Sequence, residues 1–149
     1  MPTAQLSKAQ FVRQLRNRLA THLYDESDAA PAGVAIYSLS DPRDIRARRY
    51  IGQTFAPWRR LLQHVGTARL WLPDERPWWV RSPTLRPLYE WIRELYRDEQ
   101  RLPVMVVCAW TNAANARTLE REQIHDCMRR KFPLLNFESE LLGSQIPLI

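Results

Sequence analysis

The chain has 149 residues, which suits one domain, and its 45% of apolar residues is enough for a buried core. The longest apolar run, 104–110, is far shorter than the roughly 20 residues that a membrane span needs, and the N-terminus turns polar too early for a secretory signal. Two cysteines are too few for a disulfide scaffold or a four-cysteine zinc site, so we expect a cytoplasmic protein without a membrane partner.

The net charge is +6, and 20 of the 22 basic residues are arginines, because only Lys8 and Lys131 are lysines. Guanidinium forks match the geometry of phosphate, which favours a nucleic acid as the partner. A codon bias toward arginine, without functional meaning, would give the same composition, and composition alone does not separate the two interpretations.

The first thirty residues have the pattern of an amphipathic helix followed by a linker. Ser7-Lys8-Ala9-Gln10 is a capping box, and apolar residues then recur at helical spacing to about His22. Residues 25–31 are polar with alanine and proline, which is typical of a linker. We therefore expect an N-terminal amphipathic helix and linker in residues 1–30, followed by a domain formed by residues 31–149.

Two strands are predicted next. Residues 34–39 form a β-branched and apolar run, and Asp41-Pro42 turns the chain. The basic stretch 43–49 then leads into a second strand at residues 50–52. The pair has the pattern of an antiparallel hairpin with a long, arginine-rich loop.

Three helices and one more strand follow. Pro57 suits a first helical turn, residues 72–83 are a proline-rich loop, and Ser82-Pro83 starts a second helix. Residues 104–110 are a buried strand, and residues 116–130 form the last helix, which Pro133 stops. The order after the first helix is β-β-α-α-β-α, an α+β pattern.

Several polar residues could carry chemistry, although each also has an ordinary structural interpretation. Arg60 and His64 are neighbours on one helix flank, suited to phosphate and to a proton, or simply a polar helix edge. Glu120 falls inside the apolar arc of the last helix, whereas Glu122 points away from it. A carboxylate in that arc needs either a metal ion or a buried salt bridge to an arginine.

The aromatic residues and remaining histidines and cysteines carry weaker signals. Tyr37 and Tyr50 lie on adjacent predicted strands, where a lone tyrosine is usually a packing residue. For tryptophans near prolines we favour packing over stacking on bases, and we expect surface histidines and small, buried cysteines. The tryptophans are Trp71, Trp78 and Trp79, the histidines are His22 and His125, and the cysteines are Cys108 and Cys127.

In their order along the chain, these residues resemble the GIY-YIG nuclease family. Ala35-Ile36-Tyr37 stands where the family has its first tripeptide, with alanine in place of glycine, and Tyr50-Ile51-Gly52 reproduces the second. Arg60 and His64 follow Tyr50 by ten and fourteen residues, as in the helix motif of the family. The resemblance runs from about residue 34 to residue 136. It closes with Leu119-Glu120 and Ile124, similar to the metal-carboxylate helix, and Pro133-Leu134-Leu135-Asn136, similar to the asparagine motif.

The resemblance implies a small domain with a three-stranded antiparallel sheet flanked by helices, preceded here by an N-terminal helix. It also implies an endonuclease that hydrolyses phosphodiester bonds in DNA with one magnesium or manganese ion on Glu120. A tyrosine would deprotonate the attacking water: we assign this to Tyr37, with Tyr50 positioning the water, and the reverse assignment stays open. Arg60 and His64 would supply positive charge, and Asn136 would hold the phosphate or steady the site.

Three functional interpretations stay open at this point. A nuclease would cut duplex or branched DNA, helped by basic residues and by a homodimer if both strands are cut. The fold could instead serve as a catalytically silent nucleic-acid-binding module. A protein-interaction domain using the N-terminal helix and the apolar tail, residues 146–149, is the third class. The arginines expected to bind nucleic acid are Arg43, Arg46, Arg48, Arg49 and Arg59.

Overall fold

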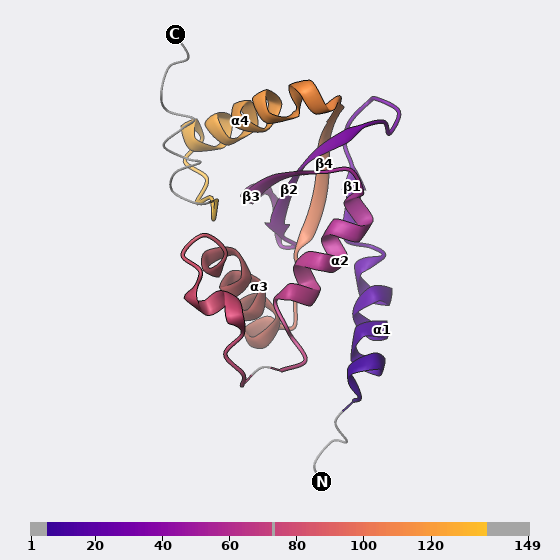
Figure 1. Cartoon of the computed structure of the whole chain (residues 1–149), viewed down its shortest axis with the longest axis vertical. Helices are drawn as coiled ribbons and strands as arrows, with labels where there is room; N and C mark the ends of the chain where they lie inside the picture. Colours follow the sequence, from indigo (N-terminus) through magenta and orange to yellow (C-terminus); the bar gives the residue numbers. More distant parts are fainter. Residues whose placement is uncertain (1–5, 73, 137–149) are drawn as a thin grey trace.

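The computed structural model describes residues 6–72 and 74–136. A four-stranded sheet in the order β1-β4-β2-β3 forms its centre, and helices cover both faces (Figure 1). The predicted α+β class is confirmed. The strands are β1 (Leu23–Asp25), β2 (Val34–Asp41), β3 (Asp44–Thr54) and β4 (Val104–Thr111). The helices are α1 (Lys8–Leu19), α2 (Pro57–Thr67), α3 (Arg86–Glu99) and α4 (Ala113–Arg129), with a short 3₁₀ helix, η1 (Trp78–Arg81).

The expected three-stranded antiparallel sheet is wrong, because β1 joins the sheet in parallel with β4. The other three strands do pair antiparallel, β2 lying between β3 and β4. Helix α1 ends before His22, whose carbonyl accepts a hydrogen bond from the Met105 N–H at 2.8 Å. The Glu26 N–H donates in turn to the Val107 carbonyl at 3.0 Å. The backbone of this segment is thus satisfied by a distant strand, which local periodicity does not reveal.

The hairpin between β2 and β3 is tighter than expected, and the predicted arginine-rich loop is wrong. Asp41 pairs with Asp44, so only Pro42 and Arg43 form the turn. The Asp41 carboxylate accepts a hydrogen bond from the Arg43 N–H at 2.8 Å, a turn contact typical of aspartate. The arginines of residues 46–49 consequently lie on a strand at the edge of the sheet.

The two faces of the sheet build separate hydrophobic clusters, because successive residues of a strand point to opposite sides. Tyr37 and Leu39 pack into the larger cluster with α1, α2 and α3. Ile36 and Ile51 pack into a smaller cluster under α4, which covers the other face (Figure 1). The sheet therefore separates a thick layer of three helices from a thin layer of one.

Local signals set where most helices begin. The Ser7 capping box is present, with hydrogen bonds in both directions between Ser7 and Gln10. Pro57 occupies the first turn of α2 as predicted. Helix α4 begins at Ala113 rather than residue 116, because the Asn112 side chain caps the Asn115 N–H at 2.9 Å.

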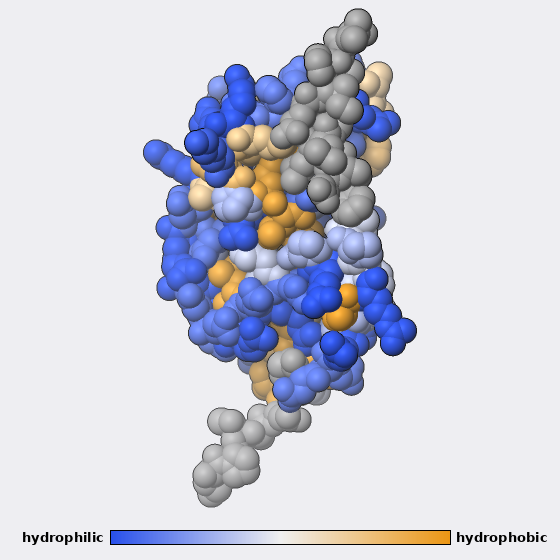
Figure 2. Space-filling view, turned by 90° about the vertical axis from the view of Figure 1, so that its left-hand side faces the viewer, coloured by the Kyte–Doolittle hydropathy of each residue, from blue (hydrophilic) through white to orange (hydrophobic). Residues whose placement is uncertain are grey.

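The surface of the molecule is largely polar. Figure 2 shows one face, on which hydrophilic side chains predominate and hydrophobic side chains show in smaller areas between them. Within residues 6–72 and 74–136, no helix is long and apolar enough to cross a membrane. The apolar tail considered for protein interaction lies outside the described residues.

Candidate active site

Tyr37 lies at the centre of β2, and its side chain is 1% exposed. Its cross-strand partner on β3 is Gly52. A Cβ at position 52 would lie 2.5 Å from the Tyr37 hydroxyl oxygen and 2.6 Å from the ring carbon that bears it. The tyrosine therefore lies directly over the backbone of β3, which only a glycine at position 52 permits.

His64, which lies on α2 in the helical layer, contacts the Tyr37 side chain. The Tyr37 hydroxyl lies 2.7 Å from His64 Nε2, and His64 Nδ1 lies 3.3 Å from the Tyr89 hydroxyl on α3. The His64 side chain is fully buried, although the sequence suggested a helix flank. A neutral imidazole has one donor and one acceptor nitrogen, so His64 connects the two tyrosines in a single chain of hydrogen bonds.

Tyr50 completes the cluster from β3. Its ring centroid lies 5.7 Å from that of His64 and 6.3 Å from that of Tyr37. Tyr50 is half-buried, whereas Tyr37 is sealed from solvent. The structure thus brings both predicted tyrosines and the predicted histidine together, with Tyr50 as the more accessible of the two tyrosines.

Arg60 lies one turn before His64 on α2 and is half-buried. Its guanidinium donates to the Gln63 side chain at 3.3 Å and interacts electrostatically with Tyr37, Tyr50 and Tyr89. Burial, assisted by the Arg60 charge, lowers the pKa of His64 to about 3. His64 is therefore neutral at ordinary pH, and Arg60 is the positive charge of the cluster.

Burial also moves the pKa of Tyr37, in the opposite direction to that of His64. Desolvation disfavours the phenolate and raises the Tyr37 pKa to about 12, although contact with the Arg60 guanidinium lowers it. The nearby Tyr89 and Glu120 raise the Tyr37 pKa further. Tyr37 and His64 are both held in their neutral forms.

Glu120 approaches the cluster from α4, and its charge reaches Tyr37. Ala116 and Ile124, which flank it on the helix, are buried as predicted, and Glu122 is exposed as predicted. Glu120 itself, between these two buried residues, is half-buried. A residue at the border of the apolar arc keeps its carboxylate within reach of solvent.

Asn136 holds the edge of the sheet next to the cluster. Its side chain is 5% exposed; its Oδ1 accepts from the Ile51 N–H at 3.0 Å, and its Nδ2 donates to the Ile51 carbonyl at 2.8 Å. The Leu135 N–H donates to the Arg49 carbonyl. These contacts give the edge strand β3 a partner at the residue between Tyr50 and Gly52. Asn136 thus steadies the strand that carries Tyr50.

Few protein side chains near this cluster could bind a divalent metal ion. In the part of the chain that the structure describes, no three His, Cys, Asp or Glu side chains gather as a metal-binding group. Magnesium commonly binds through one or two carboxylates and fills its shell with water and substrate phosphate. The half-buried Glu120 carboxylate fits that requirement, and it is the acidic residue whose charge acts on Tyr37.

The five arginines expected to bind nucleic acid have different surroundings. Arg43 forms ion pairs with Asp41 and Glu99, which raise the Arg43 pKa. Arg48 donates to the Gln123 side chain at 2.7 Å, and Arg49 donates to the Pro133 carbonyl at 3.0 Å. Within residues 6–72 and 74–136, the two that are exposed and form no ion pair are Arg46 and Arg59.

Two members of the cluster were not among the residues predicted for the site. Tyr89 lies on the buried face of α3, and the buried Trp79 packs on its ring with the centroids 5.7 Å apart. The Trp79 indole N–H donates to the Thr67 carbonyl at 2.7 Å, which fixes it at the end of α2. An aromatic residue in an apolar stripe carries no local sign that its hydroxyl will meet a histidine.

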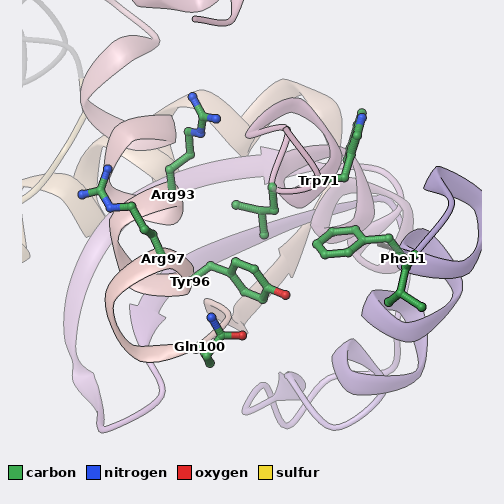
Figure 3. A pocket seen from close by; sticks show the side chains of 8 residues that line it. Phe11, Trp71, Arg93, Tyr96, Arg97 and Gln100 are labelled. Atoms are coloured by element: carbon green, nitrogen blue, oxygen red, sulfur yellow. The ribbon is translucent and has the colours of Figure 1, made fainter. Parts of the chain in front are cut away.

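Three hollows among the described residues lie outside this cluster. One, of about 370 Å³, lies between α1 and α3, and Figure 3 shows Phe11 and Tyr96 facing each other in it beside Trp71. A second, of about 700 Å³, lies along η1. A third, of about 490 Å³, lies beside β1 and the turn between β2 and β3. None of the three is lined by Tyr37, Tyr50 or His64.

Comparison with known proteins gives no relative from which a function could be transferred. The chain matched no family model, no curated protein and no solved structure.

The close approach of Tyr37 to Gly52 can be tested by adding one methyl group. We expect Gly52→Ala to lower the free energy of unfolding by about 1–3 kcal/mol, because the tyrosine must leave its place over β3. Gly66→Ala is the matched control: no atom lies within 4 Å of a Cβ there, and in a helix alanine stabilises by roughly 0.5–1 kcal/mol over glycine. Urea denaturation measures both, and equal effects of the two substitutions would contradict the contact.

The buried His64 makes stability depend on pH. The unfolded chain binds a proton at His64 near pH 6.5, whereas the folded chain does so only near pH 3, so acid favours unfolding. We expect the free energy of unfolding to fall by up to about 1.4 kcal/mol per pH unit below pH 6.5.

Denaturation of wild type and His64→Gln between pH 7 and pH 5.5 measures this contribution above the range in which most carboxylates titrate. The His64→Gln protein should lose most of the slope. His22→Gln is the control, since His22 lies partly exposed next to β1 and its pKa is also lowered by burial. The same slope in wild type and His64→Gln would show that His64 is not buried in its neutral form.

Proposed function

We propose that this chain is a metal-dependent endonuclease of the GIY-YIG type that hydrolyses phosphodiester bonds in DNA. The observation that carries the proposal is the convergence of Tyr37, Tyr50, Arg60 and His64 from β2, β3 and α2 into one cluster. The charge of Glu120 reaches the same cluster from the opposite layer. These are the residues whose order and spacing resemble the family.

Arg60 is suited to the scissile phosphate. Its guanidinium is half-buried and interacts with three tyrosines, so it presents positive charge where surrounding groups are neutral. A charge in such a place acts more strongly on a phosphate than one on the open surface. In the proposed reaction Arg60 binds a phosphate oxygen and stabilises the negative charge that develops in the transition state.

The burial of Tyr37 favours Tyr50 as the residue that contacts the attacking water, which reverses our first assignment. Tyr37 is 1% exposed and has a pKa of about 12, so it meets water rarely and resists ionisation. Tyr50 is half-buried and interacts electrostatically with Arg60. In the proposed reaction Tyr50, as a phenolate, takes a proton from water, and the water oxygen bonds to phosphorus. The bond from phosphorus to the leaving oxygen breaks, and that oxygen takes up a proton from solvent.

Glu120 would hold the divalent ion, magnesium or manganese. A bound ion of this kind neutralises charge on the phosphate and on the leaving oxygen. Tyr37 and His64 act as orienting residues in this scheme, because their hydrogen bond fixes α2 against β2 and so sets where Arg60 points. The hydrogen bonds of Asn136 to Ile51 fix the strand that carries Tyr50.

A second candidate function is a nucleic-acid-binding module of the same kind without catalysis. The observation that favours it is the burial of Tyr37, because a site that has lost its reaction can keep its tyrosine as a packing residue. The net charge of +6 suits either function. A homodimer would let the nuclease cut both strands, since one such site cuts one strand at a time.

Substitution of Glu120 separates the two candidates. We expect Glu120→Gln to reduce magnesium-dependent cleavage of DNA by at least about 100-fold, because the metal loses its protein carboxylate. Binding of the same DNA in a chelator should change by less than about twofold, since Glu120 adds no attraction for phosphate. Cleavage is measured on single-stranded, duplex and branched substrates with magnesium, with manganese and with a chelator.

Three further variants serve as controls. Glu122→Gln removes an exposed carboxylate from the same helix and should cleave like wild type. Tyr50→Phe should lose more cleavage than Tyr37→Phe if Tyr50 contacts the water. Undiminished cleavage by Glu120→Gln would sink the mechanism, and binding without cleavage by wild type on every substrate would favour the silent module.

A further inference from the structure

The hollow along η1 combines aromatic and basic side chains. It measures about 700 Å³, and its walls include Trp78, two prolines and the three arginines Arg76, Arg81 and Arg86. None of the described residues that line it is acidic. A concave surface of this composition suits an anionic ligand that also has a flat, apolar part.

Trp78 is the flat wall of this hollow. Its side chain is 60% exposed, whereas the adjacent Trp79 is fully buried. We favoured packing for both tryptophans from the sequence, and the structure supports packing only for Trp79. The turn is fixed by hydrogen bonds from the Val80 N–H to the Pro77 carbonyl at 3.1 Å and from the Ser82 N–H to the Trp79 carbonyl at 2.9 Å. The buried Trp79 thus anchors a rigid turn that presents Trp78 to solvent.

The arginines of the hollow keep charge available for a ligand. Arg86 forms an ion pair with Glu90 at 2.7 Å. Arg76 and Arg81 are exposed, and neither forms an ion pair with any residue of 6–72 or 74–136. Two guanidinium groups that line the same hollow as an exposed indole can contact neighbouring phosphates while the indole stacks on a base.

The hollow between α1 and α3 lacks this property. There Arg93 donates to the carbonyls of Leu72 and Glu75, and Arg97 pairs with Asp98. Figure 3 shows both arginine side chains directed away from Phe11 and Tyr96. Its arginines are thus engaged with the protein, so the hollow along η1 is the better of these two sites for an anion.

We propose that the hollow along η1 binds a short stretch of single-stranded nucleic acid, with Trp78 stacked on one base and with Arg76 and Arg81 on the flanking phosphates. An unpaired strand is required, because the bases of a duplex do not present their faces to a protein surface. A single strand also explains why the wall is aromatic rather than uniformly basic.

This inference deepens the proposed nuclease function and rests on it for the nature of the substrate. Trp79, next to Trp78 in sequence, packs on Tyr89, and Tyr89 hydrogen-bonds to His64. The turn that carries Trp78 is thus connected to the candidate active site through contacts of Trp79 with Tyr89 and of Tyr89 with His64. A substrate with an unpaired arm beside a duplex, as in branched DNA, would engage both.

Fluorescence anisotropy of a labelled oligothymidylate, about ten nucleotides long, in the presence of a chelator tests the site. We expect Trp78→Ala to weaken binding by about 10-fold or more, and Trp78→Phe to restore most of the affinity, since stacking needs only an aromatic face. Arg76→Ala with Arg81→Ala should lower the slope of log affinity against log salt by about 1.4, at about 0.7 for each phosphate that the protein no longer neutralises.

Matched controls come from the other hollow. Trp71→Ala and Arg97→Ala remove the same side-chain types there and should bind the oligothymidylate within about twofold of wild type. Equal losses from Trp71→Ala and Trp78→Ala would overturn the site, as would unchanged binding by Trp78→Ala. A loss that is equally large on a fully paired duplex would also overturn it, and circular dichroism shows that each variant is folded.

The outcome is separable from that of the proposed function. Binding that depends on Trp78, in a protein that cleaves no DNA, supports the hollow as a single-strand site and argues against the nuclease. Metal-dependent cleavage together with binding that is independent of Trp78 supports the nuclease and overturns this inference.

Discussion

The hydrogen bond between the Tyr37 hydroxyl and His64 Nε2, 2.7 Å long, joins two side chains that are both sealed from water. A buried polar group that loses its partner costs about 1–3 kcal/mol, so α2 cannot shift against β2 without a penalty at both ends of this bond. The bond in turn requires Gly52, because any larger residue would occupy the place of the tyrosine ring. The contacts of Tyr37, Gly52 and His64 thus fix the positions of β2, β3 and α2 relative to one another.

Differences in burial give the residues of the candidate site different roles. Burial raises the pKa of Tyr37 and lowers that of His64, which keeps both neutral and suits them to orient other groups. The charged groups, Arg60 and Glu120, are half-buried and lie closer to solvent, where a phosphate and a metal ion can approach. In the proposed nuclease, the neutral pair fixes the geometry and the charged pair binds the substrate and the ion.

Sequence spacing could predict four residues of the cluster, Tyr37, Tyr50, Arg60 and His64, but not their surroundings. The four-residue step from Arg60 to His64 placed both on one side of a helix, and hairpin pairing placed Tyr37 beside the second strand. The burial of His64 and the hydroxyl of Tyr89 were not predictable, because they depend on α3 closing over α2. Adjacent residues can also differ completely, as Trp78 and Trp79 do, since a single turn decides which indole faces the core.

The sequence by itself determined the types of most elements, the Ser7 cap of the first helix and the antiparallel pairing of β2 with β3, because each rests on interactions between residues close along the chain. Only the tertiary structure decided that residues 23–25 become a parallel strand, that the arginines after Arg43 lie on an edge strand, and that Asn136 binds the backbone of Ile51. Those outcomes join segments tens of residues apart. The backbone groups of these segments form hydrogen bonds with residues that are distant in sequence, so no local sequence pattern reveals them. The free energy of burying these groups depends on the whole fold.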